Sequence, residues 1–219
     1  MVCFLYERPV QLPWLRVALV EGRRMVSSST ARGIQVRRRL LAAAVELIPE
    51  RGWVGVSTRV LAERAGVTPS VVHYHFSSLS ELLNEAVVGV IRQALAEVDA
   101  FLETIETPVG AVEALFASVE HYSGADPMSR LTVETYLAAG RDERLRARIA
   151  EVVDEFRRRF GRWLGERGIP LPEQTVAVLV AAIDGLLLQR GLGARLDAES
   201  VVAVLRRLVG PDLVAEVGR

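Results

Sequence analysis

Hydrophobic residues recur with a helical period over most of the chain from Ile34 onward. In the first such stretch, Leu41, Ala44, Val45 and Ile48 occupy the i, i+3, i+4 and i+7 positions of one helix face. No segment shows the alternation of a strand between hairpin signals. The pattern therefore predicts an all-α fold of about nine helices.

Capping residues mark the ends of the second and third of these helices. Ser57 or Thr58 can cap the second helix, which ends at Gly66. Thr68 can cap the third helix, with Pro69 at its first position, where the missing N–H has no cost. The other helices are expected over about residues 34–52, 78–106, 109–122, 129–139, 142–167, 173–190 and 197–210.

Composition and charge narrow the class of protein. The chain of 219 residues carries 27 basic and 27 acidic side chains, so no overall positive charge indicates a nucleic-acid partner. Half of the residues are hydrophobic, yet no apolar run reaches the roughly 18 residues that a membrane span needs. Cys3 is the only cysteine, which excludes an internal disulfide and a multi-cysteine zinc site and favours a cytoplasmic location.

The first two dozen residues differ from the rest of the chain. They contain Pro9 and Pro13 among short apolar pieces and show no helical period. A polar segment that is typical of the start of a soluble domain then follows Met25. We expect residues 1–30 to be a disordered arm or a start-site extension, with translation beginning at Met25 rather than at Met1.

The second and third helices are separated by a three-residue turn with a glycine at its centre, as in a helix-turn-helix. Val72 and Phe76, four residues apart, can anchor the third helix on the core. Ser70, His73 and Tyr74 are then directed outward, and their side chains suit contacts with base edges or phosphates. An ordinary helical hairpin with solvated polar positions is the alternative.

A family resemblance is carried by LLAAAVELI at residues 40–48, ERGW at 50–53, STRVLAERAGV at 57–67, VHYHF at 72–76 and SLSEL at 78–82. Residues 34–86 thereby resemble the DNA-binding domain of the TetR family of transcriptional regulators. The resemblance implies a helix-turn-helix domain at residues 31–80 and an effector-binding and dimerisation domain at 81–219. It also implies a homodimeric repressor that a small-molecule effector releases from a palindromic operator.

The resemblance places DNA contacts in the first turns of the second and third helices. Together with two arginines upstream, the predicted DNA-binding residues are Arg37, Arg38, Thr58, Arg59, Thr68, Pro69, Ser70, Val71, His73 and Tyr74. Leu79 departs from the family, which usually has a phosphate-binding lysine there, so one anchor is missing.

The run Arg37-Arg38-Arg39 can compensate for that missing lysine. Cations near the start of a helix oppose its macrodipole, which argues against a purely structural role; a solvated charged face is the alternative. Arg32 can extend the contact as a flexible arm into the minor groove. Any such arginine contact would be with phosphates or groove walls and would not depend on sequence.

A metal site at His73 and His75 is not expected. Residues two apart on a helix point to nearly opposite sides and cannot chelate one ion together. No cofactor is predicted either.

The C-terminal half is predicted to supply a dimer interface and an effector pocket. A helix over residues 173–190 that is apolar nearly all round needs partners on both sides. Together with the final helix, over about residues 197–210, it is expected to form the dimer interface, unless both helices are buried inside one subunit. The expected dimer residues are Val176, Val180, Ile183, Leu187, Val201, Leu205 and Leu208. The candidate pocket residues, each of which can instead be plain core, are Phe101, Phe116, His121, Tyr122, Tyr136, Phe156, Trp163 and Asp184.

Two other classes of function compete with a regulator. An enzyme is not expected, because the sequence contains no nucleophile elbow, phosphate-binding glycine loop or zinc-ligand cluster. A helical ligand-binding or interaction protein with weakened DNA binding is the alternative that Leu79 and the neutral net charge favour.

Overall fold

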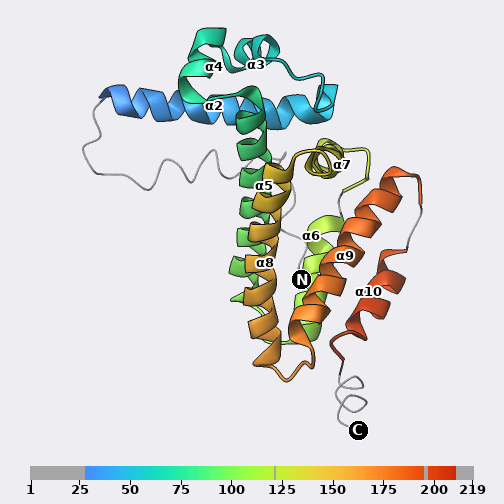
Figure 1. The fold of residues 1–219 in the computed structure, drawn as a ribbon. Helices are drawn as coiled ribbons and strands as arrows, with labels where there is room; N and C mark the ends of the chain where they lie inside the picture. The colour runs from blue at the N-terminus through green and yellow to red at the C-terminus, as the bar shows by residue number, and fades with distance from the viewer. Residues whose placement is uncertain (1–27, 121, 195–196, 211–219) are drawn as a thin grey trace. The chain divides into compact units, whose positions relative to one another are not determined.

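The computed structural model describes residues 28–120, 122–194 and 197–210, and these form helices joined by turns (Figure 1). The helices are α2 (Ser28–Arg51), α3 (Thr58–Ala65), α4 (Pro69–His75), α5 (Leu79–Leu102), α6 (Pro108–Glu120), α7 (Pro127–Ala139), α8 (Glu143–Gly165), α9 (Pro172–Gly191) and α10 (Ala198–Arg206). These nine helices, with no strand in the described ranges, confirm the predicted all-α fold. The prediction for the start of translation and most of the expected arm lie outside the described residues.

The chain divides between Arg39 and Leu40 into two compact units. The described part of the first unit is the N-terminal half of α2. That helix begins at Ser28, six residues earlier than predicted from Ile34. Residues 28–33 contain no proline, and the one glycine among them, Gly33, is tolerated inside a helix at a modest cost.

In the second unit, α3 and α4 pack on the part of α2 that follows Leu40 (Figure 1). The side chains of Leu40, Leu47 and Ile48 on α2 are completely buried, as is Leu61 on α3. The apolar period of the first helix therefore forms a core face, as predicted. We call residues 40–78, which contain this small core, the head.

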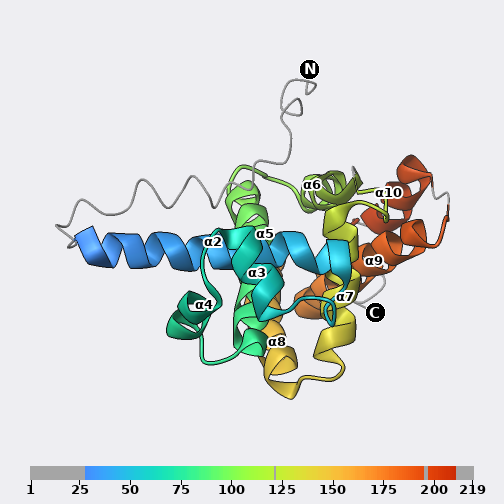
Figure 2. The same cartoon turned by 90° about the horizontal axis from the view of Figure 1, so that it is seen from above.

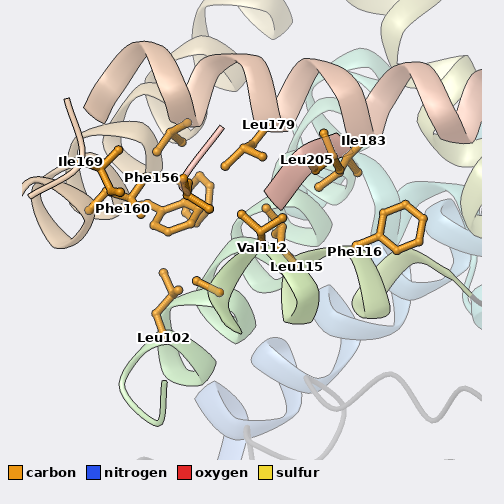
Figure 3. Packing of buried hydrophobic residues seen from close by; sticks show 14 residues of the cluster. Leu102, Val112, Leu115, Phe116, Phe156, Phe160, Ile169, Leu179, Ile183 and Leu205 are labelled. Atoms are coloured by element: carbon orange, nitrogen blue, oxygen red, sulfur yellow. The ribbon is translucent and has the colours of Figure 1, made fainter. Parts of the chain in front are cut away.

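The remaining helices of the second unit form a bundle. Both views show α5 and α8 running side by side, with α9 beside α8 and α10 beside α6 (Figures 1 and 2). Their common core contains Phe156 and Phe160 of α8, Leu179 of α9 and Leu205 of α10, each buried (Figure 3). Burying large apolar side chains from several helices is the main favourable contribution to such a bundle.

No described helix is both long enough and apolar enough to cross a membrane. The longest helices carry charges at regular intervals: α8, for example, places Phe156 and Phe160 inward while Arg158 and Arg162 face solvent. This amphipathic pattern is that of a helix lying on a protein core.

Candidate nucleic-acid interface

The turn between α3 and α4 depends on a glycine in the left-handed region. Gly66 has φ 64° and ψ 42°, a conformation that residues with a Cβ rarely adopt. The Gly66 N–H donates to the Glu63 carbonyl at 3.1 Å, and the Val67 N–H donates to the Ala62 carbonyl at 2.9 Å. These two bonds close α3 in a Schellman motif, so α4 can begin two residues after Val67.

Ser57 caps α3, as one of the two predicted caps. Its Oγ accepts a hydrogen bond from the Val60 N–H at 3.3 Å. Thr58 and Arg59 then occupy the first turn of α3, with Thr58 half-buried and Arg59 exposed. The cap therefore fixes where these two predicted DNA-binding side chains emerge.

Two buried side chains hold α4 on the head. Val72 is 2% exposed and Phe76 is 3% exposed, as their spacing of four predicted. Thr68 has the extended backbone of a cap, but its hydroxyl pairs with the Ser70 hydroxyl at 2.8 Å and makes no cap hydrogen bond. Pro69 occupies the first position of α4, as expected.

The opposite face of α4 is open to solvent. Tyr74 is 85% exposed, and Thr68, Pro69, Ser70 and His73 are exposed beside it. The face thus offers two hydroxyls, an imidazole and a phenol on a short rigid helix. Such groups can donate to phosphates and to base edges in a major groove.

His75 is half-buried, and its ring meets the Tyr74 ring edge-on with centroids 5.1 Å apart. Val71, the remaining predicted contact on α4, is also half-buried. Among the described residues, no group of three or more His, Cys, Asp or Glu side chains is arranged to hold a metal ion.

An ion-pair cluster joins α3 to α2. Arg64 contacts Glu46 at 3.1 Å and Glu50 at 2.6 Å. The hydrogen bond from Arg64 lowers the pKa of the Glu50 carboxyl below its usual value. The two glutamates are four residues apart on α2, so both carboxylates can reach one guanidinium.

The start of α5 is capped by Ser78, whose Oγ accepts from the Glu81 N–H at 3.1 Å. Glu81 in turn accepts from the N–H of Ser77, the residue before the cap, at 2.8 Å, which is a variant of the capping box. Leu79 is the first residue of α5 and is half-buried. A side chain that lacks a donor therefore stands at the place where the family usually has lysine.

The structure corrects two expectations about the upstream arginines. Because α2 begins at Ser28, the run at residues 37–39 lies well inside the helix, where the macrodipole has little effect. Arg32 is part of the same helix and not of a flexible arm. Arg39 is exposed, while Arg37 and Arg38 are half-buried.

The described residues among the predicted effector candidates differ in burial. Phe116 and Phe156 are buried in the bundle core, whereas Phe101 is about half exposed. The Trp163 ring is half-buried and lies 3.7 Å from the Arg167 guanidinium carbon. The remaining candidates are described below or lie outside the described residues, as His121 does.

The backbone carbonyl of Tyr122, another predicted effector residue, accepts a hydrogen bond from Arg190 Nη1 at 3.2 Å. An open hollow of about 550 Å³ lies between the end of α8 and the start of α9. Its lining includes Arg158, Arg162 and Glu173 and none of the predicted effector residues.

Tyr136 of α7 and Asp184 of α9 do lie together. The Tyr136 hydroxyl donates to Asp184 Oδ2 at 2.5 Å. Burial raises the pKa of the Asp184 carboxyl, and the hydrogen bond from Tyr136 and the charge of Arg157 oppose this effect. A polar cluster therefore connects α7, α8 and α9.

Of the seven predicted dimer residues, three are buried and four are partly buried in the single subunit. Val176, Ile183 and Leu205 are buried in the bundle core, so a second copy cannot contact them without repacking. The partly buried residues that pack against the same core are Val180, Leu187, Val201 and Leu208.

The opposite face of α9 is the accessible one. Val178 and Leu188 are each 51% exposed and Leu192 is 81% exposed. Ala181 and Gly185 lie between them, which gives an apolar stripe at alternating spacings of three and four residues. That spacing is typical of a helix that packs against another helix. We call these five residues the α9 stripe.

Family comparisons agree with this architecture. The model described as "Bacterial regulatory proteins, tetR family" matches residues 40–86, and that described as "Tetracyclin repressor-like, C-terminal domain" matches residues 104–211. A solved structure of a proposed transcriptional regulator from Streptomyces coelicolor A3(2) is 32% identical, with a TM-score of 0.65. The alignment covers 80% of this chain and 98% of that one. The chain belongs to the TetR family.

Other relatives of this TetR-family chain are similar over most of their length. The transcriptional regulator BetI of Brucella anthropi is 26% identical over 190 residues, which are 82% of this chain and 94% of BetI. The multidrug binding protein EbrR, solved with imidazole, is 29% identical with a TM-score of 0.60, over 80% of this chain and 94% of EbrR. The resemblance predicted from the sequence is thus confirmed, and the protein is a transcriptional regulator of the TetR family.

Proposed function

We propose that this TetR-family regulator is a homodimeric repressor that binds a palindromic operator and that a small organic effector releases. The observation that carries the proposal is the exposed face of α4. It presents Ser70, His73 and Tyr74 to solvent, while Val72 and Phe76 fix the helix to the head.

The geometry of this face suits a major groove. A short helix that enters the groove needs outward side chains of hydrogen-bonding character and a rigid attachment behind them. Arg59 and Thr58, in the first turn of α3, add a cation and a hydroxyl for phosphate contacts that set the register. Arg37 and Arg38 are further candidates for such contacts.

The α9 stripe supports a homodimer. Five apolar residues in a row on one face, three of them large and half or more exposed, are unfavourable in water. Pairing with the same stripe of a second copy removes them from water, and the small residues Ala181 and Gly185 allow the two backbones to approach closely. Twofold symmetry of the protein then matches twofold symmetry of the operator.

Response to an effector is supported by the relatives. EbrR is a multidrug binding protein whose structure contains imidazole. For this chain we propose an effector site beside Tyr136 and Asp184, two of the predicted effector residues that contact each other. Phe116 and Phe156 would be reached only by a ligand that enters the core. Binding there would favour a state in which the two heads are spaced wrongly for DNA. Such a regulator would act in the cytoplasm.

A second candidate function is an interaction protein with weakened DNA binding. Leu79 favours it, because no cation can reach a phosphate from that position. The net charge of zero also gives no general attraction to DNA.

A gel shift with DNA from upstream of the gene for this protein distinguishes the two. We expect saturable, salt-sensitive binding by the wild type and an increase of about tenfold in Kd for Tyr74→Ala. Val54→Ala, at a side chain that is 89% exposed in the α2–α3 loop, is the matched control and should bind like the wild type. Absence of wild-type binding at low salt would favour the interaction protein.

A further inference from the structure

The corner between α7 and α8 is tightly built. After α7 ends, the N–H groups of Arg141 and Asp142 both donate to the Ala138 carbonyl at 2.9 Å, and Asp142 then caps α8. The corner therefore places residue 142 by backbone bonds, independently of what its side chain contacts.

The Asp142 carboxylate divides its two oxygens between two helices. Oδ1 accepts from the N–H groups of Arg144 and Leu145 at 2.9 and 3.1 Å and so caps α8. Oδ2 accepts from Asn84 Nδ2 at 2.8 Å and from the Ser80 hydroxyl at 3.3 Å, both in the first turns of α5. One side chain thus ties the start of α8 to the start of α5.

Asn84 is an unusual residue for its place. It is only 5% exposed, it lies among the buried apolar residues Leu83 and Val87, and its Oδ1 has no partner. An apolar residue would avoid that cost of burial. Its amide hydrogen bond to Asp142 is the one described contact that gives the position a reason to be polar.

A second carboxylate on the same side of the corner contacts the head directly. Glu134 of α7 accepts from the Trp53 N–H at 2.7 Å in a partly buried contact. Gly52, with φ +75°, turns the chain so that this N–H is presented, and a Cβ at Gly52 would lie 3.6 Å from Glu134 Oε1. A backbone N–H bound to a carboxylate makes a strong, directional contact.

We propose that the α7–α8 corner is a clasp that holds the head in one orientation, with Glu134 and Asp142 as its positioning residues. The role of the clasp in DNA binding rests on the proposed function, whereas the contacts that form the clasp do not depend on it. It contacts the chain on both sides of α3 and α4: at Trp53 before them and at Ser80 and Asn84 after them. A shift of the α7–α8 corner therefore moves the chain before α3 and the chain after α4 together.

The link also extends away from the head. Two residues beyond Glu134, the Tyr136 hydroxyl contacts Asp184 of α9. The same short helix thus contacts the head at one residue and the stripe-bearing helix at another. This gives the clasp a direct mechanical connection to the proposed dimer helix.

Two pairs of variants test the clasp in the free, full-length protein. Asp142→Ser keeps an oxygen that can cap α8 but lacks the second oxygen for Asn84. Asp197→Ser makes the same change at the cap of α10, where Asp197 Oδ2 accepts from the Ser200 N–H at 2.8 Å, and is the matched control. Glu134→Leu removes the acceptor for Trp53, whereas Glu134→Gln retains one.

Hydrogen exchange followed by mass spectrometry gives the result. We expect faster deuterium uptake over residues 52–76 in Asp142→Ser and Glu134→Leu, and uptake like the wild type in Asp197→Ser and Glu134→Gln. If Asp142→Ser does not fold, Asn84→Ala should show the same faster uptake with the α8 cap intact. The clasp would be refuted if deuterium uptake over residues 52–76 is unchanged both in Glu134→Leu and in Asp142→Ser. Where Asp142→Ser does not fold, Asn84→Ala takes its place in this comparison.

A measurement of DNA binding by the same variants separates this proposal from the proposed function on which it rests. With the upstream promoter fragment, Asp142→Ser and Glu134→Leu should raise Kd about fivefold or more, because fewer heads have the competent orientation. A Kd equal to that of Asp197→Ser would contradict the role of the clasp in DNA binding. A wild type that binds no DNA would refute the proposed function, and the exchange result would still decide whether the clasp exists.

Discussion

Within α4, neighbouring residues have opposite tasks. Val72 and Phe76 are buried and hold the helix, while His73 and Tyr74 between them face solvent. This division could be predicted from the sequence, because a spacing of four on a short helix defines one face. The link from Arg64 to Glu46 and Glu50 could not be assigned in the same way, since it depends on how α3 lies on α2.

Leu79 gives a prediction about salt dependence. Leu79→Lys would place a cation at the first residue of α5, where the family usually has one. We expect tighter operator binding and a log Kd against log salt plot that is steeper by about 0.9, the value for one added phosphate contact. Fluorescence anisotropy over a series of salt concentrations measures this slope. An unchanged slope would show that position 79 does not face a phosphate.

The Arg64 cluster gives a prediction about pH. The pKa of Glu50 is lowered in the folded protein, so its contribution to stability is present above its usual value of 4.5 and is lost as the pH falls below it. Arg64→Met should therefore lower the free energy of unfolding at about pH 7, and the difference from the wild type should shrink towards about pH 3. Urea unfolding at both pH values measures it, and a difference that is constant with pH would contradict the account.

At the scale of elements, local capping signals predicted both boundaries of α3. Gly66 ends α3 and Ser57 begins it, because both act through bonds to residues within four positions. The start of α2 at Ser28 was missed, since the apolar period on which the prediction rested begins only at Ile34. The two faces of α9 were also not separable by pattern, because both are apolar and only packing shows which one the subunit core uses.

Gly66 offers a direct test of the turn. Gly66→Ala places a Cβ on a left-handed residue and should lower the free energy of unfolding by about 1–2 kcal/mol. Gly89→Ala is the matched control: it lies inside α5, its added Cβ would meet nothing within 4 Å, and it should raise stability by about 0.5–1 kcal/mol. Denaturant unfolding compares the two, and equal effects would contradict the proposed role of the left-handed turn.

At the scale of the whole molecule, the proposed homodimer gives a prediction about mass in solution. Leu188→Glu puts a charge in the stripe at a side chain that is 51% exposed in one subunit. We expect it to halve the mass in solution with little change in helix content, since burying an unpaired charge between subunits is unfavourable. Light scattering after size exclusion measures the mass, with Val54→Glu as an exposed control. If the Leu188→Glu protein keeps the mass of the wild type, the interface between subunits does not include Leu188.

The central claim is that two copies of α4 read one symmetric DNA site. Hydroxyl-radical footprinting of the wild type on the DNA upstream of its gene tests it most directly. We expect two protected patches of equal size, related by twofold symmetry and separated by about one helical turn or a multiple of it, both lost in Tyr74→Ala. A single patch, or protection that survives in Tyr74→Ala, would contradict it.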